Sequence, residues 1–375
     1  MLEAVFWASV GLIVYTHAGY PLLLWVLSRL RRTRTVHARP TDGDPPRASI
    51  IVAARNEEAV IDDKVSNARG LGYPADRLEL IVVSDGSTDR TAERARAAGA
   101  DVVLDLPHQG KVRSQDAGVD AAGSDVLVFS DANTRLEPDA VRSLVAALGA
   151  DGVGYVCGHV EFTREAGTNQ EGAYWRYETS VRSLESRLGS VTAGNGGLYA
   201  TRRESYIRVD PRMGHDLSFP FNMVKRGWRA VYEPAARGIE KMTPDSEEEY
   251  RRKRRMMSRT WLILLRSGIL SPRGYTPLYA LQVVSHRLLR YLTPFLHLIA
   301  LGANVALLGD GWVYAVTLGL QLALLAAAAL ARLVPGRALQ LARYYVLVTA
   351  APAAGLWDSL RRGVSAGWEK AEGTR

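Results

Sequence analysis

Apolar residues are concentrated near the two ends of the chain, and the middle alternates short apolar runs with polar segments. Residues 4–28 carry no Asp, Glu, Lys or Arg, and about 20 apolar residues are enough to cross a bilayer. Towards the other end, residues 292–308 and 313–330 are also apolar and free of charge. This pattern predicts membrane helices on both sides of a central domain.

Arginine is enriched beside the first apolar run, and this sets the expected topology. The residues that follow the run are Arg29, Arg31, Arg32, Arg34 and Arg39. By the positive-inside rule, the N-terminus is then outside and the central domain is cytoplasmic. A signal peptide is the alternative, but Glu3 stands where a basic region is expected and no small-residue cleavage site follows.

The C-terminal apolar block leaves two arrangements open. Residues 344–357 form a shorter apolar run, and runs of this length are more often re-entrant or interfacial than spanning. Three spans would place Arg361, Arg362 and Lys370 outside, against the charge rule, whereas two spans and an interfacial segment keep them inside. We favour the second arrangement. Just before this block, residues 279–290 mix apolar and basic side chains and predict an amphipathic helix at the membrane interface.

Strand-like and helix-like segments alternate through the middle of the chain. The continuous apolar run 48–54 is typical of a strand that is buried on both faces. Further strands are expected at residues 78–84, 101–104, 125–130, 155–162, 197–201 and 229–232. Helices are expected at residues 57–69, 88–98, 112–122, 138–148, 170–187, 216–226 and 247–265. Such alternation predicts an α/β domain with a mostly parallel sheet covered on both faces.

Composition and charge narrow the classes of function. The net charge is +8, and much of the arginine excess lies next to apolar runs, which favours a membrane surface over nucleic acid as the basic partner. The basic run 251–255 lacks the interleaved aromatic residues of nucleic-acid binding. Cys157 is the only cysteine, so no intrachain disulfide forms. No Gly-x-Gly-x-x-Gly follows the first strand and no Walker motif occurs, which excludes those two nucleotide-binding signatures.

Acidic and amide side chains follow two of the expected strands. Asp85 precedes a glycine, so its carboxylate can accept hydrogen bonds from a base or ribose at close approach; an acidic turn is the alternative. Asp131 and Asn133 stand two residues apart after a later strand. Oxygen ligands at this spacing can hold a divalent cation and the phosphates it bridges, although an Asx turn has the same residues.

Six motifs in a fixed order resemble glycosyltransferase family 2. They are Ile50-Ile-Val-Ala-Ala-Arg-Asn-Glu-Glu58, Val83-Ser-Asp-Gly-Ser-Thr-Asp89, Gly110-Lys111, Phe129-Ser-Asp-Ala-Asn-Thr134, Gly194-Asn-Gly-Gly-Leu-Tyr-Ala-Thr-Arg-Arg203 and His215-Asp216. The branch that the chain resembles most contains the membrane-bound cellulose, hyaluronan and poly-N-acetylglucosamine synthases. The resemblance covers roughly residues 48–265 and implies a GT-A fold, a nucleotide-sugar donor and an inverting transfer.

The resemblance also implies how the nucleotide is bound. Asn56, Glu57 and Asp85 would contact the nucleoside, with Arg55 beside them in the nucleotide-sugar-binding set. Lys111 would contact the uridine or its phosphates. Each of these residues follows an expected strand or opens an expected helix, where loops at the edge of a parallel sheet bind ligands.

The resemblance also implies a catalytic base, a metal site and a glycine-rich border of the donor-sugar and acceptor site. Asp216 stands at the position of the catalytic base, which takes the acceptor's proton, and Asp131 with Asn133 would hold Mg2+ or Mn2+. The glycines expected beside the donor sugar and acceptor are Gly194, Gly196 and Gly197. Arg252 or Arg255 would reach the diphosphate, and the alternative for this basic run is a solvated or lipid-facing helix surface.

The chain departs from the family pattern in three places. Asn133 replaces a second aspartate, and His215 replaces the acidic residue that often precedes the base. The processive synthases carry Gln-x-x-Arg-Trp, whereas the nearest stretch here is Arg255-Met-Met-Ser-Arg259-Thr-Trp261. Processive or single transfer, the donor sugar and the linkage therefore stay open.

The expected organisation follows from these observations. It is a transmembrane helix with a basic flank (1–32), a linker (33–47), a GT-A domain (48–245), basic and amphipathic interface helices (246–290), and two to three membrane helices with a tail (291–375). We expect a multi-pass protein of the bacterial inner membrane that transfers sugar to a glycan or lipid-linked acceptor in exopolysaccharide or envelope assembly. Expected partners are membrane lipids and export or polymerisation proteins. The alternatives are a polyprenyl-phosphate sugar synthase and a non-catalytic nucleotide-binding scaffold.

Overall fold

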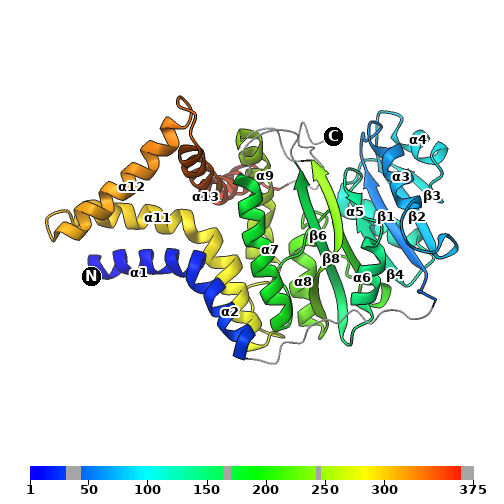
Figure 1. Cartoon of the computed structure of the whole chain (residues 1–375), viewed down its shortest axis with the longest axis horizontal. Coiled ribbons are helices and arrows are strands. Elements are labelled where there is room, and N and C mark those ends of the chain that lie inside the picture. The colour runs from blue at the N-terminus through cyan, green and yellow to red at the C-terminus, as the bar shows by residue number, and fades with distance from the viewer. Residues whose placement is uncertain (31–43, 164–169, 242–245, 365–375) are drawn as a thin grey trace.

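The computed structural model describes residues 1–30, 44–163, 170–241 and 246–364. A sheet covered by helices forms one part of the molecule, and long apolar helices form the other (Figure 1). Two long helices, α7 (Gln170–Leu188) and α9 (Ser246–Arg266), lie between the two parts.

In the described part of the chain, eight strands form one sheet in the order β3-β2-β1-β4-β7-β6-β8-β5. The strands are β1 (Ala48–Ala54), β2 (Leu78–Asp85), β3 (Val102–Leu106), β4 (Val126–Ser130), β5 (Arg135–Leu136), β6 (Val153–Thr163), β7 (Leu198–Arg202) and β8 (Arg229–Lys241). The first four strands of this order pair in parallel, as do β6 and β8. Strand β7 is antiparallel to β4 and β6, and β5 is antiparallel to β8. The predicted α/β fold with a mostly parallel sheet is confirmed.

The helices of this domain lie close to the predicted segments. They are α3 (Ile61–Arg69), α4 (Thr91–Ala97), α5 (Lys111–Ala121), α6 (Ala140–Leu148) and α8 (His215–Lys225), besides α7 and α9. The largest shift is at α3, which begins at Ile61 and not at residue 57. Asn56 has a positive φ of 51°, so the chain makes a turn before the helix can start.

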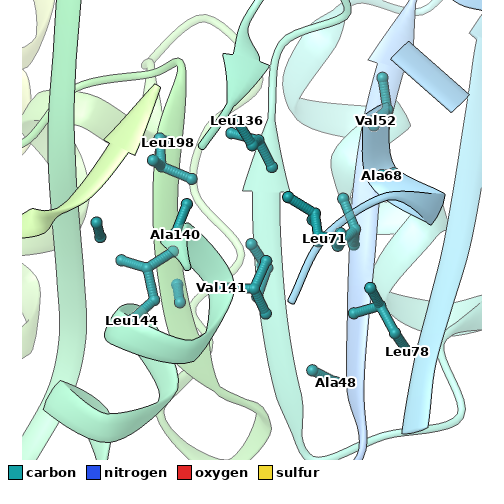
Figure 2. Packing of buried hydrophobic residues seen from close by; sticks show 14 of the residues in the cluster. Ala48, Val52, Ala68, Leu71, Leu78, Leu136, Ala140, Val141, Leu144 and Leu198 are labelled. Atoms are coloured by element: carbon teal, nitrogen blue, oxygen red, sulfur yellow. The ribbon is translucent and has the colours of Figure 1, made fainter. Parts of the chain in front are cut away.

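Hydrophobic side chains pack on both faces of the sheet. All seven residues of β1 are buried, as the continuous apolar run predicted. On one face, the cluster includes Val141 and Leu144 of α6, which Figure 2 shows lying over the strands. On the other face, Phe129, Tyr199 and Phe219 belong to a second cluster. Truncating a buried leucine in such a core costs about 2–5 kcal/mol, so this packing fixes the sheet edge that carries the candidate site.

Three helices in the described residues are long and apolar enough to cross a membrane: Leu2–Leu30, Pro277–Ala306 and Trp312–Leu330. The first joins α1 (Leu2–Val14) to α2 (Tyr20–Leu30) through a π-helical turn, Tyr15–Gly19. The second joins α10 (Pro277–Gln282) to α11 (Leu289–Ala306) through another π-helical turn, Val283–Leu288. The third is α12. Their exposed surfaces are rich in leucine and valine, as a lipid-facing surface requires.

Two features of the membrane part differ from the sequence-based expectation. The short apolar run near the C-terminus belongs to a much longer helix, α13 (Arg337–Arg362), which packs on α9 and whose Asp358 pairs with Arg254 at 2.5 Å. The expected amphipathic interface helix is the beginning of the continuous helix Pro277–Ala306. Its His286 and Arg287 are buried, because acidic side chains of α7 lie opposite them. His286 therefore faces α7, and the place of this helix at the cytoplasmic membrane interface stays a prediction.

Candidate functional site

The loops that follow β1 and β2 are locked to each other at the carboxyl edge of the sheet. Asn56 donates its backbone N–H to Ser87 Oγ (3.1 Å), and its side-chain Oδ1 accepts the N–H of Thr88 (2.7 Å). Glu57, which is buried, donates its N–H to Thr91 Oγ1 (2.8 Å). Arg55 comes directly before them and is half-buried. Arg55, Asn56 and Glu57, all from the predicted nucleotide-sugar-binding set, thus lie in the loop that is bonded to the loop after β2.

Asp85 lies at the same edge, but its side chain is fully buried. Its oxygens accept hydrogen bonds from the backbone N–H of Gln109 (2.7 Å) and of Gly110 (3.1 Å to each oxygen). One oxygen also lies 2.8 Å from Nδ1 of His108. A carboxylate at the end of β2 thus binds the loop that precedes Lys111. Direct contact of Asp85 with the nucleoside stays a prediction, because its carboxylate is buried in this structure.

Lys111 begins α5, and its ammonium pairs with the Asp131 carboxylate at the end of β4. The two side chains are 28% and 26% exposed, so a ligand can reach both. Asn133 follows in the same turn and is half-buried. Among the described residues, no group of three His, Cys, Asp or Glu is placed to hold a metal ion. A divalent cation here would take Asp131 and Asn133 as protein ligands and complete its shell with phosphate and water oxygens, which suits Mg2+.

A buried lysine and a glutamate lie next to this turn, and sequence reasoning missed both. Lys64 of α3 is 2% exposed, and its ammonium donates to Ser130 Oγ (2.6 Å) and to the Thr134 carbonyl (2.6 Å). Burial lowers the pKa of Lys64 to about 7, against the opposing effect of Asp131 and Glu240. Glu240 of β8 accepts a hydrogen bond from the Thr134 hydroxyl, and burial together with Asp131 raises its pKa.

One signal in the sequence pointed to Lys64. It stands three residues after Ile61 and four before Ala68, within the apolar stripe of α3 that faces the sheet. A charged residue on that stripe is either buried with hydrogen-bond partners, or the stripe does not face the sheet. Glu240 had no such signal, because it lies in the part of β8 beyond the predicted end of the strand.

The glycine-rich segment 194–197 runs between the two halves of the candidate site. Gly194 donates its N–H to the Asp216 carbonyl (2.7 Å), and a Cβ at Gly194 would overlap the Tyr155 hydroxyl. The carbonyl of Gly197 accepts the N–H of Asp131 (3.3 Å). A Cβ built on Gly196 would lie 3.7 Å from the Lys111 ammonium. These glycines therefore place the backbone between Asp216 on one side and the Lys111–Asp131 pair on the other.

Asp216 lies in the first turn of α8 and is half-buried. Its neighbour His215 is buried, stacks on Phe219 with ring centroids 4.1 Å apart, and pairs through Nδ1 with the Tyr199 hydroxyl (2.6 Å). Burial, and then the charge of Lys111, lower the pKa of His215 to about 3. His215 is thus a neutral packing residue.

The basic run on α9 turns its side chains in different directions. The Arg252 guanidinium lies 5.7 Å from the centre of the Phe162 ring, and its charge lowers the pKa of Glu240. Arg254 pairs with Asp358 of α13. The carbonyl of Arg255 accepts a hydrogen bond from Ser258 (2.7 Å). Arg252 therefore lies on the side of Glu240 and the candidate site, and contact of Arg252 or Arg255 with the diphosphate stays a prediction.

Comparison with known proteins agrees with this geometry. Residues 49–210 match the sequence profile described as glycosyl transferase family 2. The poly-beta-1,6-N-acetyl-D-glucosamine synthase of Staphylococcus aureus (strain COL) is 24% identical over 200 residues, which are 50% of this chain and 48% of that protein. The probable glycosyltransferase YdaM of Bacillus subtilis (strain 168) is 35% identical over 111 residues, which are 28% of this chain and 26% of that protein. The matched segments thus span about half, or less, of these curated relatives' length.

A solved structure shows the same fold over nearly the whole chain. It is the mannosyltransferase PcManGT from Pyrobaculum calidifontis in complex with GDP-Man and Mn2+, with a TM-score of 0.71 and 21% sequence identity. The similarity covers 96% of this chain and 99% of that one, so it includes the long apolar helices as well as the sheet. The architecture is GT-A-like, and the motifs that carry the candidate site lie at its carboxyl edge. The segment 49–210, which holds most of these motifs, is a glycosyltransferase family 2 domain.

Proposed function

We propose that this glycosyltransferase transfers a sugar from a UDP-sugar, with inversion, to a glycan or lipid-linked acceptor at the cytoplasmic face of a bacterial inner membrane. The observation that carries the proposal is the placement of Asp216 and the Lys111–Asp131 pair on either side of the glycines 194–197. A base and a diphosphate-binding group must lie on either side of the anomeric carbon in such a transfer. The likeness to a poly-N-acetylglucosamine synthase supports an N-acetylhexosamine donor and a role in exopolysaccharide or envelope glycan assembly.

The donor-binding half stabilises the leaving group. The Lys111 ammonium pairs with Asp131 in this structure. When the donor is bound, the diphosphate oxygens would accept charge-assisted hydrogen bonds from the same ammonium. Asp131 and Asn133 would hold Mg2+ or Mn2+, which offsets the negative charge that develops on the leaving nucleotide. The loop that carries Asn56 and Glu57 lies at the same edge and would bind the nucleoside.

The acceptor half supplies the base. A hydroxyl group is a poor nucleophile, so a carboxylate must take its proton while it attacks the anomeric carbon, and the partly exposed Asp216 fits this role. His215 is unsuited to it, because it is buried and stays neutral near pH 7. A single base is enough for a transfer with inversion, in contrast to the paired carboxylates of most glycoside hydrolases.

The test is a UDP-release assay on the full-length protein in lipid nanodiscs, with a panel of nucleotide sugars and of glycan and lipid-linked acceptors. We expect metal-dependent release with one donor, and a fall in kcat of about 100-fold or more in Asp216→Asn, the usual contribution of a general base. Asp151→Asn is the matched control, because Asp151 is an exposed residue that comes just before the first residue of β6. Full activity in Asp216→Asn would favour a lipid-phosphate acceptor, which needs no strong base. Absence of turnover with every pair would contradict the proposed function.

A further inference from the structure

A buried group of charged and polar side chains lies where the membrane helices meet the catalytic domain. We call it the junction cluster, and its members are Glu178, Glu185, Thr192, His286 and Arg287. Each of these residues is at most 8% exposed. Two of them come from α7, one from the segment after α7, and two from the helix Pro277–Ala306. Figure 1 shows that this helix and α2 run beside α7.

The members of the junction cluster pair with one another. His286 Nδ1 lies 2.8 Å from Glu185 Oε1, and His286 Nε2 lies 3.6 Å from Glu178 Oε2. Arg287 Nε donates to the Thr192 hydroxyl oxygen (2.9 Å). Glu185 also accepts the N–H of Thr192 (2.9 Å), and the Thr192 hydroxyl lies 3.0 Å from the same carboxylate oxygen. Since these groups are buried and pair with each other, the junction cluster connects α7 and the segment after it to the helix Pro277–Ala306.

Other bonds tie the N-terminal helix to the same place. The hydroxyl of Tyr20 donates to Glu185 Oε1 (2.6 Å), and Tyr15 shares a hydrogen bond with Ser285 (2.8 Å). Tyr15 and Ser285 both lie in the π-helical turns, Tyr15–Gly19 and Val283–Leu288. Such turns are rare and occur frequently at functional sites. Both membrane helices therefore change their helical geometry where they meet the catalytic domain.

Stability alone does not explain the junction cluster. Burial by itself would raise the pKa of Glu185, but His286 and Arg287 more than reverse this and hold its pKa below the ordinary value. The carboxylate is therefore charged. Replacing a buried ion pair with apolar side chains of similar size is often neutral or stabilising, so its presence calls for a second role, such as fixing one arrangement of the segments it joins.

The segment that the cluster holds leads directly to the catalytic edge. Thr192 is two residues before Gly194, whose N–H donates to the Asp216 carbonyl (2.7 Å). The carbonyl of Val191 accepts the Tyr279 hydroxyl (3.1 Å), which is a further bond from the helix Pro277–Ala306. The segment 191–197 is thus bound by a membrane helix at one end and by the backbone of Asp216 and Asp131 at the other.

We propose that Glu185, Thr192 and Arg287 are positioning residues, through which the helix Pro277–Ala306 fixes the segment 191–197 against Asp216. The inference rests on the proposed function, in which this segment borders the donor sugar and the acceptor. It deepens that function, because it makes the membrane helices part of the active-site geometry and not only an anchor.

The test is Thr192→Val, which keeps the size of the side chain and its backbone bond to Glu185 but removes the hydroxyl that Arg287 and Glu185 share. We expect kcat to fall by about 10- to 100-fold, as a small misplacement of reacting groups does, with the donor KM changed less than about twofold. Thr192→Ser should restore most of the lost kcat. The matched control is Thr201→Val: Thr201 is equally buried, and its hydroxyl makes no hydrogen bond in the described part of the chain.

Hydrogen–deuterium exchange separates this inference from the proposed function, because it needs no turnover. In Thr192→Val the amides of residues 191–197 should exchange at least about tenfold faster than in the wild type, and in Thr201→Val they should not. If the wild type transfers no sugar but the exchange result holds, the proposed function fails and the positioning role stands. Wild-type kcat and wild-type exchange in Thr192→Val would overturn the inference. So would a loss that Thr192→Ser does not rescue.

Discussion

Asp85→Asn distinguishes a carboxylate that supports the Lys111 loop from one that contacts the nucleoside. Asp85 is fully buried and accepts bonds from Gln109, Gly110 and His108. Asparagine keeps a single acceptor oxygen and turns an NH2 group toward these donors. The variant loses a charge-assisted hydrogen bond and places its NH2 group against two donors, which should lower the free energy of unfolding by about 2–4 kcal/mol. The Lys111 loop should therefore loosen.

The loss should be visible in both stability and catalysis. For a domain of about 200 residues, each kcal/mol shifts the apparent Tm by about 2–4 °C, so we expect a decrease of roughly 4–16 °C. The donor KM should rise as well, because Lys111 follows the loosened loop. The measurements are thermal unfolding and UDP-release kinetics on the same preparation in nanodiscs, with saturating Mn2+.

The matched control is Asp105→Asn, the same substitution on the neighbouring strand β3, where the side chain is exposed. It should leave both quantities within error of the wild type. A direct nucleoside contact gives a different pattern, in which the donor KM rises at an unchanged Tm. An apparent Tm of Asp85→Asn within about 1 °C of the wild type would therefore refute the supporting role.

Two further predictions concern the residues around the Asp131 turn. Because burial lowers the pKa of Lys64 from 10.5 to about 7, the unfolded chain binds more protons between these values, and stability should rise as the pH increases from 7 towards 10. Between pH 6.5 and 9.5 the free energy of unfolding of the wild type should rise by on the order of a few kcal/mol, and Lys64→Met should remove most of this rise. Unfolding curves recorded across this range measure it, and a wild-type slope in Lys64→Met would contradict the lowered pKa. Asn133→Asp adds a charged ligand, so the Mn2+ concentration for half-maximal turnover should fall several-fold in a metal titration, and an unchanged or higher value would exclude Asn133 from the metal site.

Most of the fold could be predicted from the sequence, because the local apolar pattern of most strands and helices agrees with their burial in the structure. Strand β1 is uniformly apolar and lies in the middle of the parallel region, so its place in the sheet could be inferred. Strand β8 was expected to end early, because residues after Tyr232 are mixed polar and apolar. In the structure they continue the strand, since β6 and β5 supply backbone partners that no local pattern reveals.

The candidate site divides in the same way. Residues such as Lys111 and Asp131 could be found because they stand in short motifs directly after strands. The partners of Asp85 could not, since they are two backbone N–H groups and the His108 ring, all more than 20 positions away. The junction cluster was also out of reach, because its charges are separated by about 100 positions and look like ordinary surface residues until the helices pack.

The junction cluster also bears on how the protein matures. Helix α2 is synthesised before the catalytic domain, and the helix Pro277–Ala306 is synthesised after it. Until that later helix is packed, Glu185 and Glu178 lack their partners His286, Arg287 and Arg290. A domain that still lacks this helix therefore carries acidic groups without these partners, and its segment 191–197 lacks the bonds from Tyr279 and Arg287. We therefore expect the segment 191–197 of a newly made chain to become ordered only after the helix Pro277–Ala306 has packed against α7.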